Sequence, residues 1–491
     1  MKSLVSALGV LCFSLSAMAT PATLRSKGAV GDGVTDDRAA IEKALKDAAG
    51  TPLDGEGLTY AVQGTVSVSV DVDLRNVILK QTQGSWDASP YIRSAASQET
   101  PQVKPAESLT KMVKGLPWLR YDGVATYPED PVVTGDDLKA LREMLNLRTL
   151  FIHGRENQPV SIRLEKVQVL RGNHPDAGMH SNAAGLYLVD ASPVTLTDIE
   201  ITGDGKGAGL FVHRCRKVRM DRVNIHDILW APYRGDTEFT AAVLGGDFGW
   251  NNSPIYDFDE RAGRFMRVRV QEQLTGMTIG SSDDVEITNS RIERIGTKVD
   301  GKFLPWQADG VTVSGVKNLV MRDCVITSTW EGIDFTGQGV DGFVQENIRI
   351  SDSFAYGFKY AHPQKNGKVI NCISEHAAYR GFTIGAECEN IEFIHCVARE
   401  TGSKNYWRRE GRERNGIYGF ELGFQEDASP QNITFKDCRA ENVAFPTTME
   451  CGFGTSDRAA KPELNIRLIH PKVVGATLRA VDGFRVVEEA P

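Results

Sequence analysis

The 491-residue chain lacks a long apolar segment once its first twenty residues are set aside. No later run approaches the roughly 20 apolar residues that a membrane-spanning helix needs. A basic surplus is also missing, because 56 Lys and Arg face 64 Asp and Glu, for a formal net charge of −8. Since phosphate binding needs a basic face, nucleic acid is not expected as a partner. We expect neither a membrane span nor a nucleic-acid partner.

Cysteine patterns typical of metal sites are absent as well. The sequence has no CxxC pair and no Cys/His cluster at zinc spacing, so we expect no structural metal. Four of its eight cysteines, Cys324, Cys372, Cys396 and Cys438, share one position in a repeat described below. Their equivalence predicts an interior stack of small, buried, free thiols. A disulfide between neighbouring coils stays open at this point.

The N-terminus carries the chain's one targeting pattern. Lys2 is followed by an apolar run over residues 4–18 and by Ala17-Met18-Ala19, a small-residue cleavage site. A positive start, a short apolar core and such a site are typical of a secretory signal peptide. We therefore expect residues 1–19 to be removed and the mature protein to be exported, to the periplasm or outside the cell.

Glycine is abundant, with 48 residues, and it recurs at a fixed phase. Seven segments read Gly, apolar, variable, apolar, and they begin at Gly185, Gly209, Gly310, Gly332, Gly357, Gly381 and Gly419. A period in the twenties with one short strand at a fixed phase is typical of a solenoid. Because strand residues alternate between faces, we expect the apolar residues to face inward and the variable one outward.

A second set of apolar strands follows the first in phase. Its members lie at residues 218–220, 285–287, 319–321, 348–350, 369–370, 391–393 and 433–435. Two strand ladders in each coil predict an all-β fold, a single-stranded right-handed parallel β-helix with an N-terminal capping helix and long loop insertions. We expect the cap and first coils at 20–83, an insertion with one helix at 84–149, the β-helix at 150–455 and C-terminal cap strands at 456–491.

The N-terminal cap carries a recognisable motif. Residues 31–37 read Gly-Asp-Gly-Val-Thr-Asp-Asp, and Ala40, Ile41, Ala44 and Leu45 then form a helical stripe. This passage resembles the N-terminal signature of pectate-lyase-like and polygalacturonase-like β-helix proteins, among them rhamnogalacturonases and many tailspikes. The resemblance implies a strand, a turn and a helix that covers the open end of the solenoid. Such an end needs a cover, because it exposes unpaired backbone and an apolar core.

Carboxylates gather at outward positions of consecutive coils. Hydrolysis of a glycosidic bond needs two carboxyl groups, and Asp309, Glu331 and Asp334 lie on neighbouring coils. The segment at residues 307–311, Gln-Ala-Asp-Gly-Val, resembles the Asn-Thr-Asp-Gly-Ile segment of polygalacturonases, whose Asp belongs to the catalytic set. The resemblance implies a catalytic role for Asp309, while Glu331 and Asp334 are placed by coil position. The family's Gly-His-Gly and Arg-Ile-Lys segments are not evident.

Lysine chemistry offers a second interpretation. A polysaccharide lyase needs a base and a cation that stabilises an enolate-like intermediate, and Lys359 and Arg380 lie one coil apart. A cationic neighbour can lower the pKa of a lysine enough to make it a base. Residues 358–362 resemble the basic Arg/Lys-x-x-His stretches of β-helix lyases. The three carboxylates could then hold Ca²⁺, and C5-epimerisation would share the first half of this chemistry.

Aromatic and basic residues near these positions are the candidates for substrate binding: Trp306, Trp330, Tyr356, His362, Trp407 and Arg408. Lys359 and Arg380 could pair with a substrate carboxylate. We therefore expect a polygalacturonase-like glycoside hydrolase that cleaves an acidic, uronate-containing polysaccharide or oligosaccharide without a cofactor or metal. A lyase or epimerase with Ca²⁺ is the first alternative. A non-catalytic carbohydrate-binding solenoid is the second, because fold does not fix function.

Overall fold

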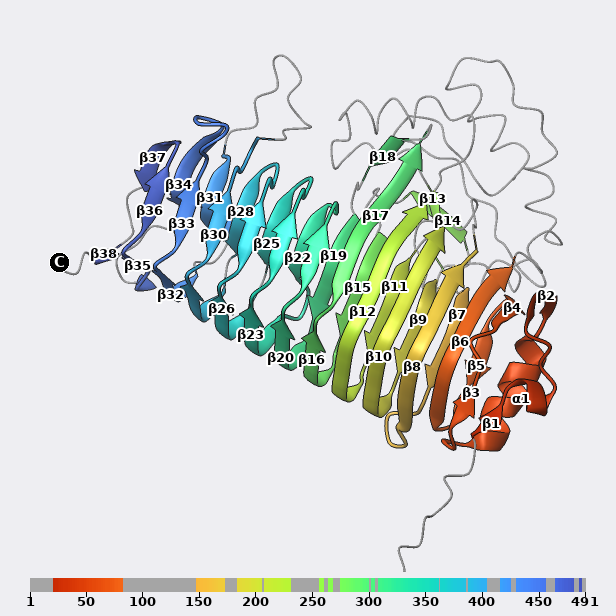
Figure 1. The fold of residues 1–491 in the computed structure, drawn as a ribbon. Helices are drawn as coiled ribbons and strands as arrows, with labels where there is room; N and C mark the ends of the chain where they lie inside the picture. The colour runs from red at the N-terminus through yellow and green to blue at the C-terminus, as the bar shows by residue number, and fades with distance from the viewer. Residues whose placement is uncertain are drawn as a thin grey trace, which may run out of the picture.

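The computed structural model describes residues 21–82, 147–172, 183–204, 207–230, 256–259, 264–267, 274–299, 302–304, 308–361, 363–385, 387–403, 416–424, 430–455, 464–480 and 485–487. The strands stack in chain order along one axis, from the N-terminal end in red to the C-terminal end in blue (Figure 1). The predicted signal peptide and nearly all of the insertion predicted at 84–149 lie outside these residues. No helix in the described part of the chain is both long and apolar enough to cross a membrane.

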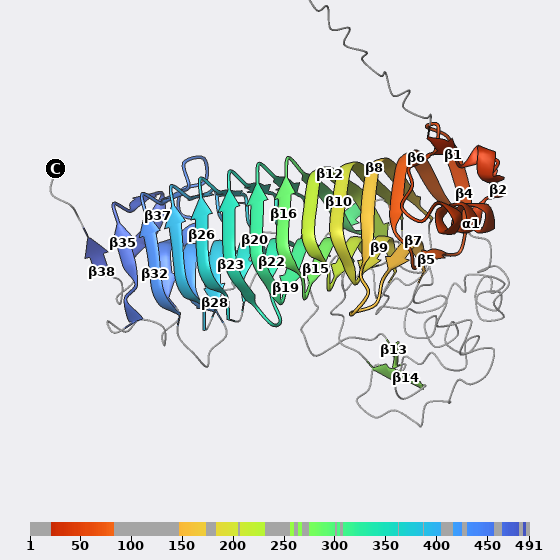
Figure 2. The same ribbon diagram turned by 90° about the horizontal axis from the view of Figure 1, so that it is seen from below.

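The N-terminal end of the stack is covered by short elements: β1 (Ala22–Thr23), η1 (Arg25–Lys27), β2 (Asp32–Asp36), α1 (Arg38–Ala48), β3 (Leu53–Asp54) and β4 (Thr59–Gln63). Helix α1 lies at this end beside the first strands (Figure 2) and buries Ile41, Ala44 and Leu45. Asp37, at the start of α1, is buried, and its carboxylate accepts hydrogen bonds from the backbone N–H groups of Val30 and Gly31 at 2.6 and 3.0 Å. This carboxylate of the signature motif therefore fixes a turn.

One sheet of twelve parallel strands carries the glycine repeat, and we call it the glycine sheet. In spatial order, it consists of β5 (Val66–Val68), β7 (Arg148–His153), β9 (Ala184–Val189), β11 (Ala208–His213), β15 (Leu274–Gly280), β19 (Ala308–Ser314), β22 (Glu331–Phe335), β25 (Tyr356–Tyr360), β28 (Arg380–Gly385), β31 (Tyr418–Phe424), β34 (Met449–Thr455) and β37 (Ala476–Ala480). Successive coils thus contribute adjacent strands, as the shared glycine phase predicts.

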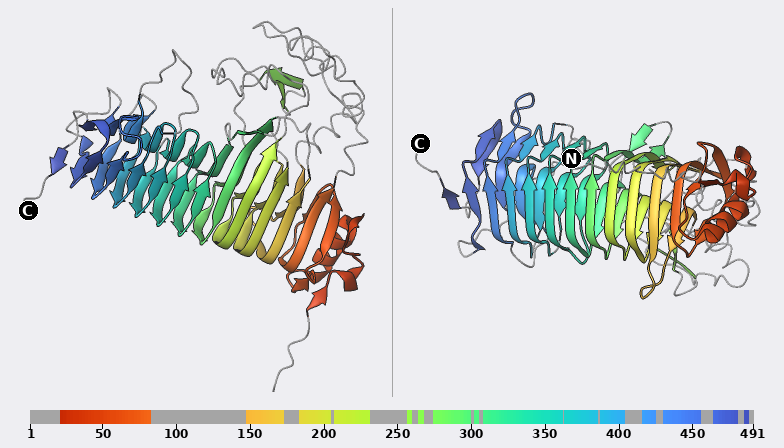
Figure 3. Two further views of the ribbon diagram at one scale, coloured as in Figure 1. Left: turned by 45° about the horizontal axis from the view of Figure 1, so that its top comes forward. Right: turned by 60° about the horizontal axis from the view of Figure 1, so that its bottom comes forward.

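The remaining strands of the solenoid form the bent sheet, whose coils lie side by side in Figure 3. Its first coils use long strands: β6 (Val72–Thr82), β8 (Val160–Arg171), β10 (Ala191–Asp204) and β12 (Arg216–Trp230). Later coils split into pairs: β16 (Asp283–Thr288) with β17 (Arg291–Val299), β20 (Val316–Arg322) with β21 (Val325–Thr327), β23 (Val340–Glu346) with β24 (Arg349–Ser351), β26 (Lys365–Ile370) with β27 (Ile373–Glu375), β29 (Glu389–Ile394) with β30 (Val397–Arg399), β32 (Gln431–Lys436) with β33 (Arg439–Glu441), and β35 (Arg467–Ile469) with β36 (Lys472–Val474), before β38 (Arg485–Val487). The short strand β18 (Lys302–Leu304) pairs antiparallel with β17, and β13 (Tyr256–Asp259) and β14 (Arg264–Arg267) form a separate hairpin.

The expectation of two strand ladders in each coil is wrong for these later coils, which carry three. A left-handed residue bends the bent sheet between the paired strands, as at Asp323, Asn347 and Asn371, with φ of 54°, 54° and 53°. Asp and Asn tolerate this conformation better than most residues, and their side chains hydrogen-bond from coil to coil, Asn347 to Asp323 at 3.0 Å and Asn371 to Asn347 at 3.3 Å. Apart from β17, the strands that follow the bend are three residues long, too short for alternation to show in the sequence.

Close packing between coils explains the glycine repeat. A Cβ atom added at Gly332 would lie 2.3 Å from Cγ2 of Ile350 on the bent sheet and 2.6 Å from the carbonyl oxygen of Gly357 in the next coil. The same two kinds of contact recur at Gly310 and Gly381. A Cβ atom at Gly276 would make the same two contacts, although the repeat found in the sequence did not include this glycine. Glycine is therefore required at each step by the coil that follows it.

The interior of the solenoid is apolar and ordered by the same repeat. Phe358, Phe382, Phe420 and Phe453 stack in a column with ring centroids 4.6, 4.7 and 4.7 Å apart. Parallel stacking of this kind adds to the burial of large aromatic side chains. The cysteines predicted to face the interior, Cys324, Cys372, Cys396 and Cys438, are buried free thiols, as are Cys215, Cys388 and Cys451.

The tight contact at Gly332 leads to a stability prediction. We expect Gly332→Ala to lower the free energy of unfolding by about 1–3 kcal/mol, the usual cost of overpacking a tight interior. Urea unfolding followed by circular dichroism measures this change. Ile350→Ala removes the methyl group that the new Cβ would strike, so the double variant should lose less than the sum of the two single variants. Additive losses would contradict a clash with Ile350; the clash with the carbonyl oxygen of Gly357 is present in both backgrounds.

Candidate functional site

Two columns of outward side chains run along the glycine sheet, one on each side of the glycine. In β19, both Gly310 and Val311 are buried, so strand alternation is interrupted and Asp309 and Thr312 face outward together. The Thr312 hydroxyl donates a hydrogen bond to Asp309 at 3.4 Å. Along these columns the five predicted catalytic residues occupy adjacent coils: Asp309, Glu331, Asp334, Lys359 and Arg380.

Four of these residues form what we call the acid–lysine cluster: Asp309, Glu331, Asp334 and Lys359. Lys359 lies directly beside Asp334 in the register of the sheet. Its ammonium group donates hydrogen bonds to the two carboxylate oxygens of Glu331 at 3.0 and 2.8 Å and lies 3.4 Å from Oδ1 of Asp334. Carboxylate oxygens of Asp309, Glu331 and Asp334 lie within 4.8 Å of one another. The stacking of coils has brought three carboxyls around one ammonium group.

Burial shifts the titration of this cluster. Loss of solvent, and then the nearby charge of Asp334, raise the pKa of Asp309 to about 7. Burial also raises the pKa of Glu331, although Lys359 opposes this shift. One ammonium group cannot neutralise three buried carboxylates, so the cluster keeps a proton near neutral pH. We place this proton on Asp309, because Glu331 hydrogen-bonds to Lys359 directly and Asp334 lies 3.4 Å from the same ammonium group, whereas loss of solvent and the charge of Asp334 raise the pKa of Asp309.

Lys359 has the wrong protonation state for a catalytic base. Burial alone would lower the pKa of its ammonium group, but the surrounding carboxylates of Glu331, Asp334 and Asp309 outweigh burial and raise the pKa above its ordinary value. A lysine base needs the opposite shift. The lyase interpretation is therefore disfavoured at this residue.

Arg380 is also held by a carboxylate, one that the sequence did not indicate as a site residue. Glu421 accepts a hydrogen bond from an Arg380 terminal nitrogen at 2.8 Å, and its other oxygen lies 2.8 Å from Nε of Arg380. The Thr383 hydroxyl donates to the same oxygen at 2.7 Å. Glu421 is the variable residue after Gly419, so its position in the repeat was the signal that could have revealed it.

Tyrosine rings enclose Arg380. Its guanidinium carbon lies 5.6, 5.8 and 5.6 Å from the ring centroids of Tyr356, Tyr379 and Tyr418. These distances are within the range of cation–π attraction. Burial, opposed by the charge of Arg380, raises the pKa of Tyr356 to about 12, so this hydroxyl stays protonated. Of these three rings, that of Tyr356 also lies 6.0 Å from the Lys359 ammonium nitrogen, so it adjoins the acid–lysine cluster as well as Arg380.

The other residues predicted to bind substrate have different outcomes. Trp330 is only 8% exposed and packs in a small cluster with Ala355 and Tyr379, so it offers little ring surface to a ligand. Tyr356 is partly exposed and faces the site. The remaining four, Trp306, His362, Trp407 and Arg408, lie outside the described residues.

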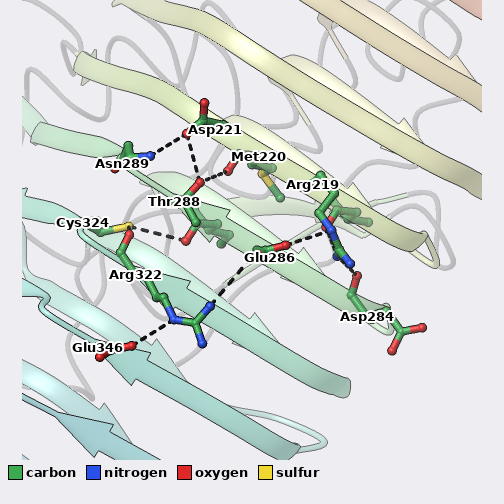
Figure 4. A network of polar contacts seen from close by, with 12 residues as sticks. Arg219, Met220, Asp221, Asp284, Glu286, Thr288, Asn289, Arg322, Cys324 and Glu346 are labelled. Carbon is green, nitrogen blue, oxygen red and sulfur yellow. Dashed lines mark hydrogen bonds and ion pairs between the residues drawn. The ribbon is translucent and has the colours of Figure 1, made fainter.

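Charges on the bent sheet give a useful contrast. There, Arg219 lies 2.9 Å from Glu286, and Arg322 bridges toward Glu346 at 3.0 Å (Figure 4). The side chains of Arg219 and Glu286 are 55% and 33% exposed, whereas those of Lys359 and Glu331 are 15% and 6% exposed. Exposed ion pairs contribute little to stability and carry no sign of chemistry. Buried, perturbed charges mark a functional site more often.

The carboxyl groups have the chemistry to bind Ca²⁺, which prefers oxygen ligands. However, the ammonium group of Lys359 already lies among them and supplies the positive charge there. The residues present therefore do not fit Ca²⁺ well, and we derive no step through a metal. Two observations therefore disfavour the sequence-based alternative of a Ca²⁺-dependent lyase. Lys359 is protonated and cannot act as the base, and its ammonium group occupies the place where Ca²⁺ would bind.

Comparison with solved structures gives low similarities over most of the chain. The surface protein and adhesin PfbA of Streptococcus pneumoniae is 14% identical, with 95% of this chain and 100% of that chain covered and a TM-score of 0.47. DFA-IIIase of Arthrobacter chlorophenolicus A6 is 11% identical, with 96% of this chain and 99% of that chain covered and a TM-score of 0.43. The A-module of the mannuronan C-5 epimerase AlgE4 of Azotobacter vinelandii is 10% identical, with 95% of this chain and 100% of that chain covered and a TM-score of 0.33. No curated protein matches the sequence.

Family models give a more direct result. The model of the right handed beta helix region matches residues 176–341 and 258–444, which together exceed half of the chain. A second model, the N terminal extension of bacteriophage endosialidase, matches residues 29–73, the part that contains α1. The resemblance to pectate-lyase-like proteins stated from the sequence is thereby confirmed at the level of fold, and this chain belongs to the right-handed parallel β-helix family.

Proposed function

We propose that this protein hydrolyses glycosidic bonds, with Asp309 as the general acid and Asp334 as its partner carboxylate. The observation that carries this proposal is the buried cluster itself, in which carboxylate oxygens of Asp309, Glu331 and Asp334 lie within 4.8 Å of one another beside Lys359, and in which the pKa of Asp309 is raised to about 7. In the reaction, the glycosidic C–O bond breaks and the Asp309 proton passes to the leaving oxygen. Asp334 takes a proton from the attacking water or attacks the anomeric carbon itself.

The other two members of the cluster have supporting roles. The positive charge of Lys359, 3.4 Å from Oδ1 of Asp334, favours the carboxylate form of Asp334 that this role requires. Environments that separate the pKa values of two neighbouring carboxyls are what acid–base catalysis requires. Glu331 holds the Lys359 ammonium in place with both of its oxygens. Glu331 is therefore a positioning residue in this proposal.

The reaction class has a direct test. The protein is incubated with a panel of polysaccharides, and both reducing ends and absorbance of unsaturated uronates are followed. New reducing ends without that absorbance would support hydrolysis, whereas the absorbance would support a lyase. Binding without any turnover would favour the non-catalytic alternative.

Export of the protein remains a prediction that rests on the N-terminal sequence.

The pKa of Asp309 predicts the pH dependence of activity. A general acid works in its protonated form, so kcat/KM should fall as pH rises above about 7, by roughly tenfold per pH unit. A pH–rate profile on a cleaved glycan measures this alkaline limb. A base with a pKa in this range would give the reverse, with activity rising through the same interval. A profile that rises from pH 6 to 8 would rule out Asp309 as the acid.

A further inference from the structure

We infer that the substrate of this site is a neutral glycan, in place of the uronate polymer expected from the sequence; this inference rests on the proposed hydrolase function. The uronate expectation used Lys359 and Arg380 as partners of a substrate carboxylate. In the structure, both cations already have carboxylate partners on the same face of the glycine sheet.

Lys359 is saturated by the protein itself. Its ammonium group donates hydrogen bonds to both oxygens of Glu331 and forms an ion pair with Asp334 at 3.4 Å, so two carboxylates of the protein already surround it. A uronate carboxylate would have to displace Glu331 or Asp334 from it. Either displacement leaves a buried carboxylate without its partner, which is strongly unfavourable.

Arg380 is committed in a similar way. Glu421 meets its guanidinium group with both carboxylate oxygens, and rings of Tyr356, Tyr379 and Tyr418 surround it. The side chains of Arg380 and Glu421 are 16% and 6% exposed, so this pair is not a mobile surface pair. A second carboxylate could not pair with Nε and the Glu421-bound terminal nitrogen of Arg380 without displacing Glu421.

The charge balance of the face points the same way. The five strands β19, β22, β25, β28 and β31 contain four carboxyl groups, Asp309, Glu331, Asp334 and Glu421, and two cations, Lys359 and Arg380. With Asp309 protonated, carboxylates still outnumber cations. Among the described residues of these five strands, a substrate carboxylate would find both cations already paired and would be repelled by the remaining carboxylates. Sugar hydroxyls, in contrast, can donate to these carboxylate oxygens and accept from tyrosine hydroxyls.

Pairs of polymers that differ only in charge test this inference. Polygalacturonate, mannuronan and glucuronan are each compared with the neutral polymer obtained by reducing its carboxyl groups, so that linkage and ring configuration are shared. We expect the neutral member of a cleaved pair to have a kcat/KM at least tenfold higher than its uronate partner. A preference for the uronate member would overturn the inference and leave the hydrolase proposal intact. Cleavage of no member would overturn both.

A binding measurement separates substrate class from turnover. Asp309→Asn protein is run in native gels that contain each polymer, and its retardation is compared at low and high salt. We expect retardation by a neutral member that does not depend on salt, because no charge pair is involved. Salt-sensitive retardation by a uronate member would overturn the inference even for a protein that does not turn over.

A matched pair of variants tests the cause. Glu421→Gln takes the carboxylate away from Arg380, so the KM for the uronate member should improve by about tenfold, the effect of roughly one new charge-assisted hydrogen bond. Glu346→Gln makes the same chemical change at the partner of Arg322 on the bent sheet, where no effect is expected. Equal effects of the two variants, or none at Glu421, would contradict this explanation.

Discussion

Asp309→Asn is expected to lower kcat by about 10²–10⁴-fold, the usual effect of removing a general acid. Asn has nearly the shape of Asp but cannot donate the proton that the leaving oxygen needs. The loss should appear mainly in kcat, because the amide can still accept the hydrogen bond from Thr312. Steady-state kinetics on a cleaved glycan measure it, and circular dichroism checks that the fold is kept.

Asp284→Asn is a control for this prediction. Asp284 is exposed on the bent sheet, has a φ of 54° that Asn tolerates, and accepts a hydrogen bond from Asn318. Its replacement should leave kcat unchanged. Asp309→Asn with nearly full activity would show that another group supplies the proton, and Glu331 would then be the first residue to test, since burial raises its pKa as well.

The second large effect is expected on stability at Lys359. Lys359→Met leaves three carboxyls within 4.8 Å of one another without their ammonium group. Breaking a mostly buried pair in this way should lower the free energy of unfolding by about 3–5 kcal/mol at neutral pH. Chemical denaturation measures the loss. Arg322→Met, which breaks exposed ion pairs on the bent sheet, should cost less than about 1 kcal/mol.

The pH dependence of this variant has a defined sign. Without Lys359, the pKa values of the remaining carboxyls should lie further above their unfolded values, so the folded state binds more protons than the unfolded state. Stability then falls as pH rises, and the deficit should shrink between about pH 7 and pH 5. Added Ca²⁺ should raise the melting temperature of the variant more than that of the wild type, because a cation can replace the lost charge. A deficit that does not depend on pH or Ca²⁺ would mean that Lys359 contributes through packing alone.

The sequence predicted the architecture well, because the glycine repeat has a steric cause that acts in every coil. A Cβ at Gly310 or Gly357 would strike both the next coil and the bent sheet, so the residue type itself records the position. The glycine segment at Gly276 was missed, since a long insertion before it breaks the spacing, although residues 285–287 of the same coil were predicted as a strand. The third ladder was not separated from the second, because strands such as β21 and β24 have only three residues each. Residues 348–350, predicted for the second ladder, in fact overlap β24 of the third, and the second-ladder strand of that coil is β23.

The candidate site could be predicted only as a list of outward residues. Asp309, Asp334 and Lys359 were placed on neighbouring coils from their phase in the repeat, and the structure brings them together. The sequence could not predict which carboxylate each cation would bind. The pair of Arg380 with Glu421 depends on side-chain direction and burial across a coil that is lengthened by an insertion, and neither quantity is visible in a repeat.

Because the coils stack, the distance between neighbouring strands of the glycine sheet does not depend on the number of residues that connect them. Gly209 and Gly276 face each other in adjacent strands, as do Gly357 and Gly381, although the first pair is much further apart in sequence. Each step advances the axis by one strand spacing, about 4.8 Å, however many residues leave the coil and return. Insertions at the corners can therefore lengthen, shorten or exchange without altering the spacing of Asp309, Asp334 and Lys359. The stacked coils therefore fix the distances between the reacting groups, while the loops around these groups can change in evolution.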